Sequence, residues 1–552
     1  SDSLPEKAII VEEEILIDDS NLSWEFKKLE NFTFESKLLI SSVNIKSGLV
    51  FINCNFRKGV EFLDIKTDFM ISHKNPFNYS ILFNNCKGNY IGIFESHNIS
   101  RGLLLENECL FDKVSIIRSR LSEIKIRNSK INKLLDLSIV KSNEIRLDEN
   151  HLKEHFRIES LEGDISLISN TFNNWVKFWN IKTNRSLALN KNTFNDEFKI
   201  EASKIKGFFI HEDTFNKQFL LENRDTSGGN HEAYCKEIFI TKAKFLEGAD
   251  FKGLGKEINK ITLRLSPGLE GVLNFEGWNL ENLQVSGINQ NLKLLFKKMN
   301  FKVVLFNNFT NYADLSFDKC SAIENSTLNF LNTNFGSARF NEFDLATFNV
   351  ILIDNVSLDS VKVSNVKWFE NNQLEIGSNP TEEETQRGIR ELSRQLKYAL
   401  SSSGNQIDSL LFKAREMQAY RNELRTKGKS YSIFDRIIMS VNMSNDYGLN
   451  WWKPVLIIFF ITLSFYILML PLFSTAINYK PGNSFADISN TFIEFWNNFN
   501  VFWQMFNPAR KFSETYGNAN SGLLYFFDLI HRIVLGIFIF QIIKGFRKFS
   551  LR

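Results

Sequence analysis

The sequence predicts a mainly β protein, in which a β-helix is followed by an α-helical connector and two transmembrane helices. Three observations support this fold class. Short alternations of apolar and polar residues recur about every 21 residues, as expected for stacked strands. The 552 residues include 54 Phe but only 8 Pro, so one kind of core position is used repeatedly with few breaks. Two long apolar stretches lie near the C-terminus.

The overall composition limits the class of function. The formal net charge is only +3, so electrostatics gives no support for a nucleic-acid partner. The five Cys are scattered singly along the chain, without a CxxC pair. This pattern argues against a disulfide framework or a structural zinc site, and it suits a reducing compartment. Residues 1–37 are expected to form an N-terminal cap or leader. They start with an acidic stretch and lack the features of a secretory signal, so we expect the β-helix to be cytoplasmic.

The repeat is clearest between residues 110 and 215. Apolar residues follow one another at intervals of 21, 21, 20, 22 and 21, and they are Leu110, Ile131, Leu152, Phe172, Phe194 and Phe215. This period matches one coil of a β-solenoid, in which equivalent side chains form interior ladders. Two residues before the Phe positions stand Asn170, Asn192 and Asp213, which we expect to be turn residues. The series restarts at Phe245 after 30 residues, so segment 222–235 is predicted to be a loop.

Further along the chain the interval shortens to five residues. The apolar positions there are Phe330, Phe335, Phe340, Leu345 and Val350. This spacing resembles the pentapeptide-repeat family, and the resemblance implies a right-handed quadrilateral β-helix with four five-residue faces per coil. We place the β-helix at residues 38–370, with an irregular version of the repeat over residues 38–288.

Some other β-helices are polysaccharide lyases or hydrolases, whose sites need clustered carboxylates. The Asp and Glu residues here are dispersed along the chain. His151 and His155 lack a third ligand, so we expect a solvated pair rather than a metal site. We therefore expect that the protein is not an enzyme, and we assign no catalytic residue, metal or cofactor.

Residues 371–446 form the predicted connector. Thr381 and Glu384 are expected to make a capping box, and apolar residues then repeat at helical spacing up to Leu400. After a short break, a second, antiparallel helix is predicted, whose apolar face consists of Ile407, Leu410, Leu411, Ala414, Met417 and Leu424. A third amphipathic stretch at 431–442 leads toward the membrane and could lie along its surface.

This connector resembles that of bacterial pentapeptide-repeat membrane proteins. The residues that carry the resemblance are Arg394, Leu396, Lys397, Gly404, Asn405, Phe412, Glu416 and Met417. The resemblance covers residues 390–552. It implies a two-span domain similar to ion channels, which we place at 447–552, and a bacterial inner membrane as the location.

The first apolar stretch, 455–473, contains no charge and is long enough to cross a bilayer. Before it, Trp451, Trp452 and Lys453 are expected to be interface anchors. The second stretch, 523–543, carries the candidate membrane-embedded polar residues Asp528, His531 and Arg532. Asp528 and Arg532 could pair inside the protein or beside a water-filled path, or the charges could mark the outer interface. Basic residues outside both stretches predict that both termini are cytoplasmic.

Between the two spans, residues 491–512 carry aromatic residues at helical spacing with amides among them. In a ring of subunits such a helix could line water, and the candidate pore-lining residues are Glu494, Asn497, Asn498, Gln504 and Asn507. The same helix could instead lie on the outer leaflet. Arg510 and Lys511 are expected at the outer mouth. The chain has no TVGYG-type filter, which disfavours potassium selectivity.

These features predict a homo-oligomeric membrane channel or pore, whose β-helix is a sensor or an assembly platform. A stress or phage-defence effector is a subordinate version of this hypothesis. The alternative is a membrane-anchored β-helix scaffold that binds a partner protein without conducting ions. The expected partners are the lipid bilayer, other copies of the chain, and an unidentified cytoplasmic protein or ligand on the β-helix.

Overall fold

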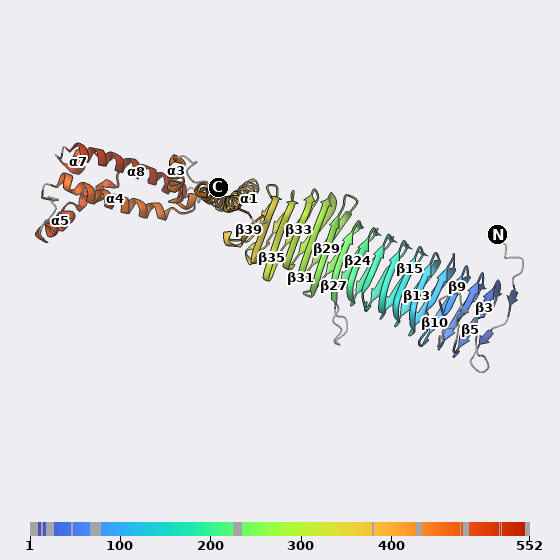
Figure 1. Ribbon diagram of the computed structural model, residues 1–552. Coiled ribbons are helices and arrows are strands. Elements are labelled where there is room, and N and C mark those ends of the chain that lie inside the picture. The colour runs from blue at the N-terminus through green and yellow to red at the C-terminus, as the bar shows by residue number, and fades with distance from the viewer. Residues whose placement is uncertain are drawn as a thin grey trace. The chain divides into compact units, whose positions relative to one another are not determined.

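The structure is a computed structural model that describes residues 9–12, 15–17, 27–45, 48–66, 79–224, 234–377, 380–426, 433–474, 476–477, 485–517, 519 and 521–546. The chain divides into two compact units, Ser1–Glu375 and Ile376–Arg552. Parallel strands build the first unit, and helices build most of the second (Figure 1).

The first unit is a β-solenoid of about 15 turns, so the mainly β fold class is confirmed. Its strands form two parallel sheets. The first sheet contains β3 (Lys27–Glu30), β6 (Leu49–Ile52), β9 (Ile81–Asn84), β11 (Leu103–Glu106), β13 (Arg120–Arg127), β15 (Lys141–Asp148), β18 (Glu162–Ile168), β21 (Ser186–Asn190), β24 (Lys204–His211), β27 (Tyr234–Thr241), β29 (Glu257–Leu265), β31 (Asn279–Asn289), β33 (Asn300–Asn311), β35 (Ser321–Asn334), β37 (Val350–Ser357) and β39 (Leu374–Ile376).

The second sheet consists mostly of shorter strands, often two per coil. They are β1 (Ile9–Val11), β2 (Ile15–Ile17), β4 (Phe32–Phe34), β5 (Leu38–Ser41), β7 (Asn55–Phe56), β8 (Val60–Leu63), β10 (Lys87–Phe94), β12 (Leu110–Ile117), β14 (Lys130–Ser138), β16 (His151–Leu152), β17 (His155–Glu159), β19 (Thr171–Phe172), β20 (Val176–Trp179), β22 (Thr193–Phe194), β23 (Phe198–Glu201), β25 (Thr214–Phe215), β26 (Phe219–Glu222), β28 (Lys244–Lys252), β30 (Glu270–Glu276), β32 (Asn291–Lys297), β34 (Leu315–Asp318), β36 (Arg339–Asn341) and β38 (Lys362–Ser364). Strand pairing begins before residue 38, since β1 pairs with β4 and β2 with β5.

The predicted Phe ladder is present in the core of the solenoid. Phe172, Phe194 and Phe215 pair in register on successive coils, and their ring centroids are 4.8 Å apart at both steps. Phe215 stacks on Phe245 at 5.0 Å, so the longer interval keeps the register. Residues 225–233 of the predicted loop lie outside the described residues, between β26 and β27.

The upstream end of the ladder corrects one expectation. Phe111, rather than Leu110, pairs with Ile131 and is buried. Leu110 pairs with Lys130 and is half-buried. Neighbouring strand residues point to opposite faces, so two adjacent apolar residues leave the inward position ambiguous in the sequence.

Asn170, Asn192 and Asp213 lie in the turns between strands, as expected, but they do not adopt the left-handed conformation. The left-handed backbone conformation belongs to the residue before each of them, with φ of 53° at Ser169 and 58° at Lys191. Asn170 and Asn192 are buried, and each forms part of an interior polar ladder. The amide nitrogen of Asn170 donates to the carbonyl of Leu147 (2.7 Å) and to Oδ1 of Asn192 (3.0 Å).

The five-residue series is buried as the repeat predicts, except at its end. Phe335 and Phe340 are in the core, together with Phe330 and Leu345. Val350 is half-buried, and Ile351 is buried in its place. The inward position therefore moves by one residue where β37 begins.

The second unit begins with a helical hairpin of α1 (Glu382–Ser402) and α2 (Gln406–Thr426). The capping box is confirmed, because Thr381 Oγ1 accepts from the Glu384 N–H and Glu384 accepts from the Thr381 N–H. Lys397 and Glu416 join the two helices through a 2.6 Å ion pair. Ile407 is exposed rather than part of the predicted apolar face, since it lies in the first turn of α2.

The remaining helices are α3 (Ile433–Met443), the 3-10 turn η4 (Asp446–Gly448), α4 (Trp452–Phe473), α5 (Phe485–Asn497), α6 (Phe499–Met505), α7 (Phe512–Tyr516) and α8 (Gly522–Phe546). Helices α4 and α8 coincide with the two predicted spans and pack against each other. Both are long and apolar enough to cross a membrane.

Candidate functional site

The segment between α4 and α8 packs onto both helices. Val501, Phe502 and Met505 of α6 are buried against Tyr466 and Leu470 of α4. The Tyr466 hydroxyl also donates a 2.6 Å hydrogen bond to the carbonyl of Phe495, at the end of α5. Apolar burial and this bond therefore hold the segment on these helices.

Arg510 follows α6 and is folded inward, with only 6% of its surface exposed. One guanidinium nitrogen, Nη1, donates to the carbonyls of Met505 (2.6 Å) and Asn507 (3.4 Å). Carbonyls at the C-terminus of a helix lack partners within the helix and carry partial negative charge, so a cation is favourable there. Arg510 thus caps α6 and brings its positive charge into the protein.

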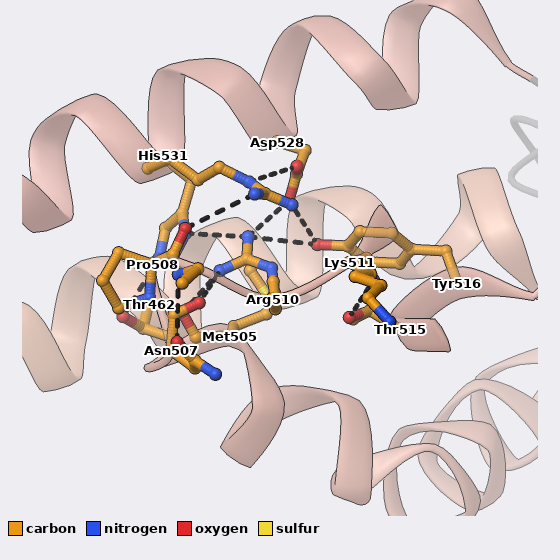
Figure 2. A network of polar contacts seen from close by, with 12 residues as sticks. Thr462, Met505, Asn507, Pro508, Arg510, Lys511, Thr515, Tyr516, Asp528 and His531 are labelled. Atoms are coloured by element: carbon orange, nitrogen blue, oxygen red, sulfur yellow. Dashed lines mark hydrogen bonds and ion pairs between the residues drawn. The ribbon is translucent and has the colours of Figure 1, made fainter. Parts of the chain in front are cut away.

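Asp528 of α8 forms an ion pair with Arg510 (Figure 2). Its Oδ1 accepts hydrogen bonds from Nη2 of Arg510 and from the Tyr516 hydroxyl, the latter at 3.0 Å. Its Oδ2 accepts from Nε of Arg532, one turn further along α8, at 2.7 Å. Burial raises the pKa of the Tyr516 phenol, which therefore remains a hydrogen-bond donor.

His531 continues the cluster to α4. Nη2 of Arg510 lies 3.3 Å from its Nδ1, and Oγ1 of Thr462 lies 3.1 Å from its Nε2. A guanidinium group can only donate, so Nδ1 must be the acceptor. The neutral imidazole then carries its proton on Nε2 and donates it to Thr462. His531 and Thr462 are both fully buried.

The cluster holds two guanidinium groups and one carboxylate in an enclosed site. Asp528 is 4% exposed, whereas the side chain of Arg532 is 26% exposed and reaches the edge of the site. Buried charges are costly unless they are paired and hydrogen-bonded. Here carbonyl, phenol and imidazole groups supply the additional bonds, so these residues can hold charge in an apolar setting.

The sequence predicted part of this cluster. Asp528, His531 and Arg532 lie together, and the predicted pair of Asp528 with Arg532 is confirmed. Arg510 was expected at an outer mouth, but it is buried in the cluster. Tyr516 and Thr462 were missed. The signal that could have found Arg510 is charge balance, because a carboxylate such as Asp528 in an apolar helix needs a cation nearby.

The candidate pore-lining residues divide between two faces of the loop. Glu494 accepts a 2.7 Å hydrogen bond from Ser474, which holds the pKa of Glu494 below its usual value, and Asn498 donates to the Glu494 carbonyl. Asn497, Gln504 and Asn507 are exposed. Asn498 also separates α5 from α6, so the expected single helix is interrupted there.

The exposed face of the loop contains an aromatic strip and an amide strip. Phe492 and Trp496 are exposed one turn apart on α5, and Trp503 is exposed on α6. The exposed amides are Asn497 at the end of α5, Asn500 and Gln504 one turn apart on α6, and Asn507 after α6. The expected aromatic stripe is therefore split, because Phe495, Phe499 and Phe506 pack inward near the buried cluster of α4 and α6.

The predicted interface anchors lie at the start of α4. Trp452 is exposed, and Trp451 stacks on Phe546 of α8 at 5.0 Å. Lys453 forms a 2.7 Å ion pair with Asp446. Comparison with known proteins gives no match to a family model, a curated protein or a solved structure.

Proposed function

We propose that the protein is a homo-oligomeric membrane channel or pore of a bacterial inner membrane, with both termini and the β-solenoid in the cytoplasm. The solenoid acts as a sensor or an assembly platform. The observation that carries this proposal is the buried cluster of Arg510, Asp528 and His531, which holds the loop on both spans. A loop held in this way presents its amide strip at a constant position.

The cluster favours a channel over a simple anchor. Ionisable side chains within membrane-spanning segments are costly and are usually found beside ion or substrate paths. An anchor needs one apolar helix and no internal charges. One subunit with two spans cannot enclose a path, so several copies must surround it. In such a ring, Asn497, Asn500 and Gln504 line water while the aromatic strip faces lipid.

Planar-bilayer recording of the purified full-length protein tests this proposal. We expect conductance that is not potassium-selective, and we expect the combined variant Asn497→Ala, Asn500→Ala and Gln504→Ala to change the unitary conductance. The control is Asn173→Ala, an exposed amide on the solenoid. A monomeric particle without conductance under any condition would reject the channel and favour a membrane-anchored scaffold that binds a partner protein. An opening signal from stress or phage infection is a subordinate part of the proposal.

A further inference from the structure

Helix α3 has an exposed apolar face. Ile433, Ile437 and Ile438 are 67%, 53% and 54% exposed, and they fall on one side of the helix. Within α3, all of which the structure describes, no residue is buried. An exposed apolar face of this kind marks a contact with a membrane or with another protein.

On the polar side of α3, Asn442 contacts the end of α8. Asn442 accepts a 3.1 Å hydrogen bond from Nζ of Lys544, near the end of α8. Asn445, just after α3, is fully buried, and its amide nitrogen donates to the carbonyl of Gln541 at 3.0 Å. These bonds fix which side of α3 points outward.

The exposed apolar surface continues from α3 onto the spans. Exposed side chains on α4 include Phe459 and Phe460, and those on α8 include Ile537 and Phe540. The Trp451–Trp452 pair stands at the start of α4, and Trp is enriched where a bilayer meets water. Helix α3 is therefore at the bilayer surface if α4 and α8 cross the bilayer.

A groove of about 340 Å³ lies between α3 and α8. Its lining is mainly apolar, and it consists of Ile433, Arg436, Ile437, Ser440, Val441 and Phe538. Arg436 is the charged residue of this lining. An apolar groove with a guanidinium group fits an acyl chain whose headgroup carries a phosphate.

We propose that α3 lies in the bilayer surface and that the α3–α8 groove binds an anionic phospholipid, with Arg436 beside its phosphate. This inference rests on the membrane integration in the proposed function, but it does not depend on conduction. A second copy of the chain is a less suitable occupant. The apolar surface is continuous with the spans, and basic residues border it, as expected for a helix on an anionic leaflet.

Spin labels on full-length protein in phosphatidylglycerol-containing vesicles test the position of α3. The five native Cys are all buried, so an introduced exposed Cys is labelled selectively. We expect a label at Ile438→Cys to be accessible to oxygen and shielded from a water-soluble nickel complex. A label at Asp435→Cys, on the polar side of α3, should show less accessibility to oxygen. Access of nickel to the Ile438→Cys label would overturn the inference, and so would shielding from both reagents with spin–spin broadening, which indicates a second copy.

A label at Phe460→Cys on α4 separates the two proposals. If it is accessible to the nickel complex, the spanning assignment itself fails. If it is shielded while Ile438→Cys is not, only the inference for α3 fails. For the groove, native mass spectrometry should show about fivefold lower retention of phosphatidylglycerol by Arg436→Gln than by wild type. The matched control is Arg394→Gln on α1, and equal retention by all three proteins would reject the phospholipid site.

Discussion

Nε2 of His531 lies 3.1 Å from Oγ1 of Thr462, and this contact joins α8 to α4 at a point where both side chains are fully buried. On its other side, the imidazole of His531 faces the guanidinium group of Arg510. The ring thus connects α8 to the loop and to α4. Because neither contact can be replaced by water, each is a sensitive point for mutation.

Thr462→Val removes the acceptor for His531 while keeping the side-chain shape. We expect the free energy of unfolding in detergent to fall by roughly 0.5–2 kcal/mol, because a buried donor loses its partner. Denaturant titration followed by near-UV circular dichroism measures this. Ser464→Ala is the matched control, since the Ser464 hydroxyl bonds only within its own helix and is exposed. Equal effects of both substitutions would contradict the assignment.

Asp528→Asn is expected to destabilise the second unit more than Arg510→Gln. The Asn variant leaves two guanidinium groups without a carboxylate, whereas the Gln variant leaves the pair of Asp528 with Arg532. The loss for Asp528→Asn should be about 3–5 kcal/mol. Thermal unfolding in detergent gives the ranking, and Lys511→Gln, which disrupts an exposed pair with Glu514, should have little effect. The reverse order would show that Asp528 does not balance both cations.

Phe194→Ala opens a cavity inside the solenoid, between the rings of Phe172 and Phe215. The expected cost is roughly 3–5 kcal/mol. Since stacked coils unfold partly independently, hydrogen exchange of β19, β22 and β25 is the suitable measurement. Thr193→Ala, on the outer side of the same strand, should leave exchange nearly unchanged. Loss of protection restricted to β22 would contradict a continuous ladder.

Asp213 gives the solenoid a pH dependence. Burial raises the pKa of its carboxyl from 3.8 to about 7. Between about pH 4 and 7, the Asp213 carboxyl is therefore protonated in the folded state and ionised in the unfolded state. The stability that Asp213 contributes is fully present below about pH 4, and it is lost as the pH rises toward 7. The change is at most about 4 kcal/mol.

Urea unfolding at several pH values should show this slope in the wild type and not in Asp213→Asn. The difference between the two proteins is the relevant quantity, because other carboxylates act in the opposite direction. The hydrogen bond from Lys133, for example, lowers the pKa of Asp112. Parallel slopes in both proteins between pH 4 and 7 would contradict the assignment.

The sequence was sufficient to predict the repeat and the order of the β-helix, the helical connector and the two apolar helices. A Phe every 21 residues has few explanations other than a stacked coil, and the ladder from Phe172 to Phe215 follows from that period. The period did not predict which of two neighbouring residues points into the core. Leu110 and Phe111 are both apolar, so the period cannot tell which one points inward. Asn170 has the composition of a turn residue, but its amide is needed inside to bond the neighbouring coil.

The candidate site was harder to predict, because its members come from separate elements. Asp528, His531 and Arg532 lie within one turn of α8 and attract attention as charges in an apolar stretch. Arg510 stands in a polar segment, where nothing local distinguishes it from its neighbour Lys511. Only the fold shows that Arg510 turns inward to cap α6, while Lys511 pairs with Glu514 at the surface.

The solenoid also sets the distance between its first and last coils. Adjacent parallel strands are about 4.8 Å apart, so the sixteen strands of the β3–β39 sheet place its two ends roughly 70 Å from each other. Any molecule that binds at the first coils acts at that distance from any molecule that touches the last. Removing one whole coil, such as residues 170–191, would shorten this rigid spacer by a single strand interval and leave the ladders on either side in register.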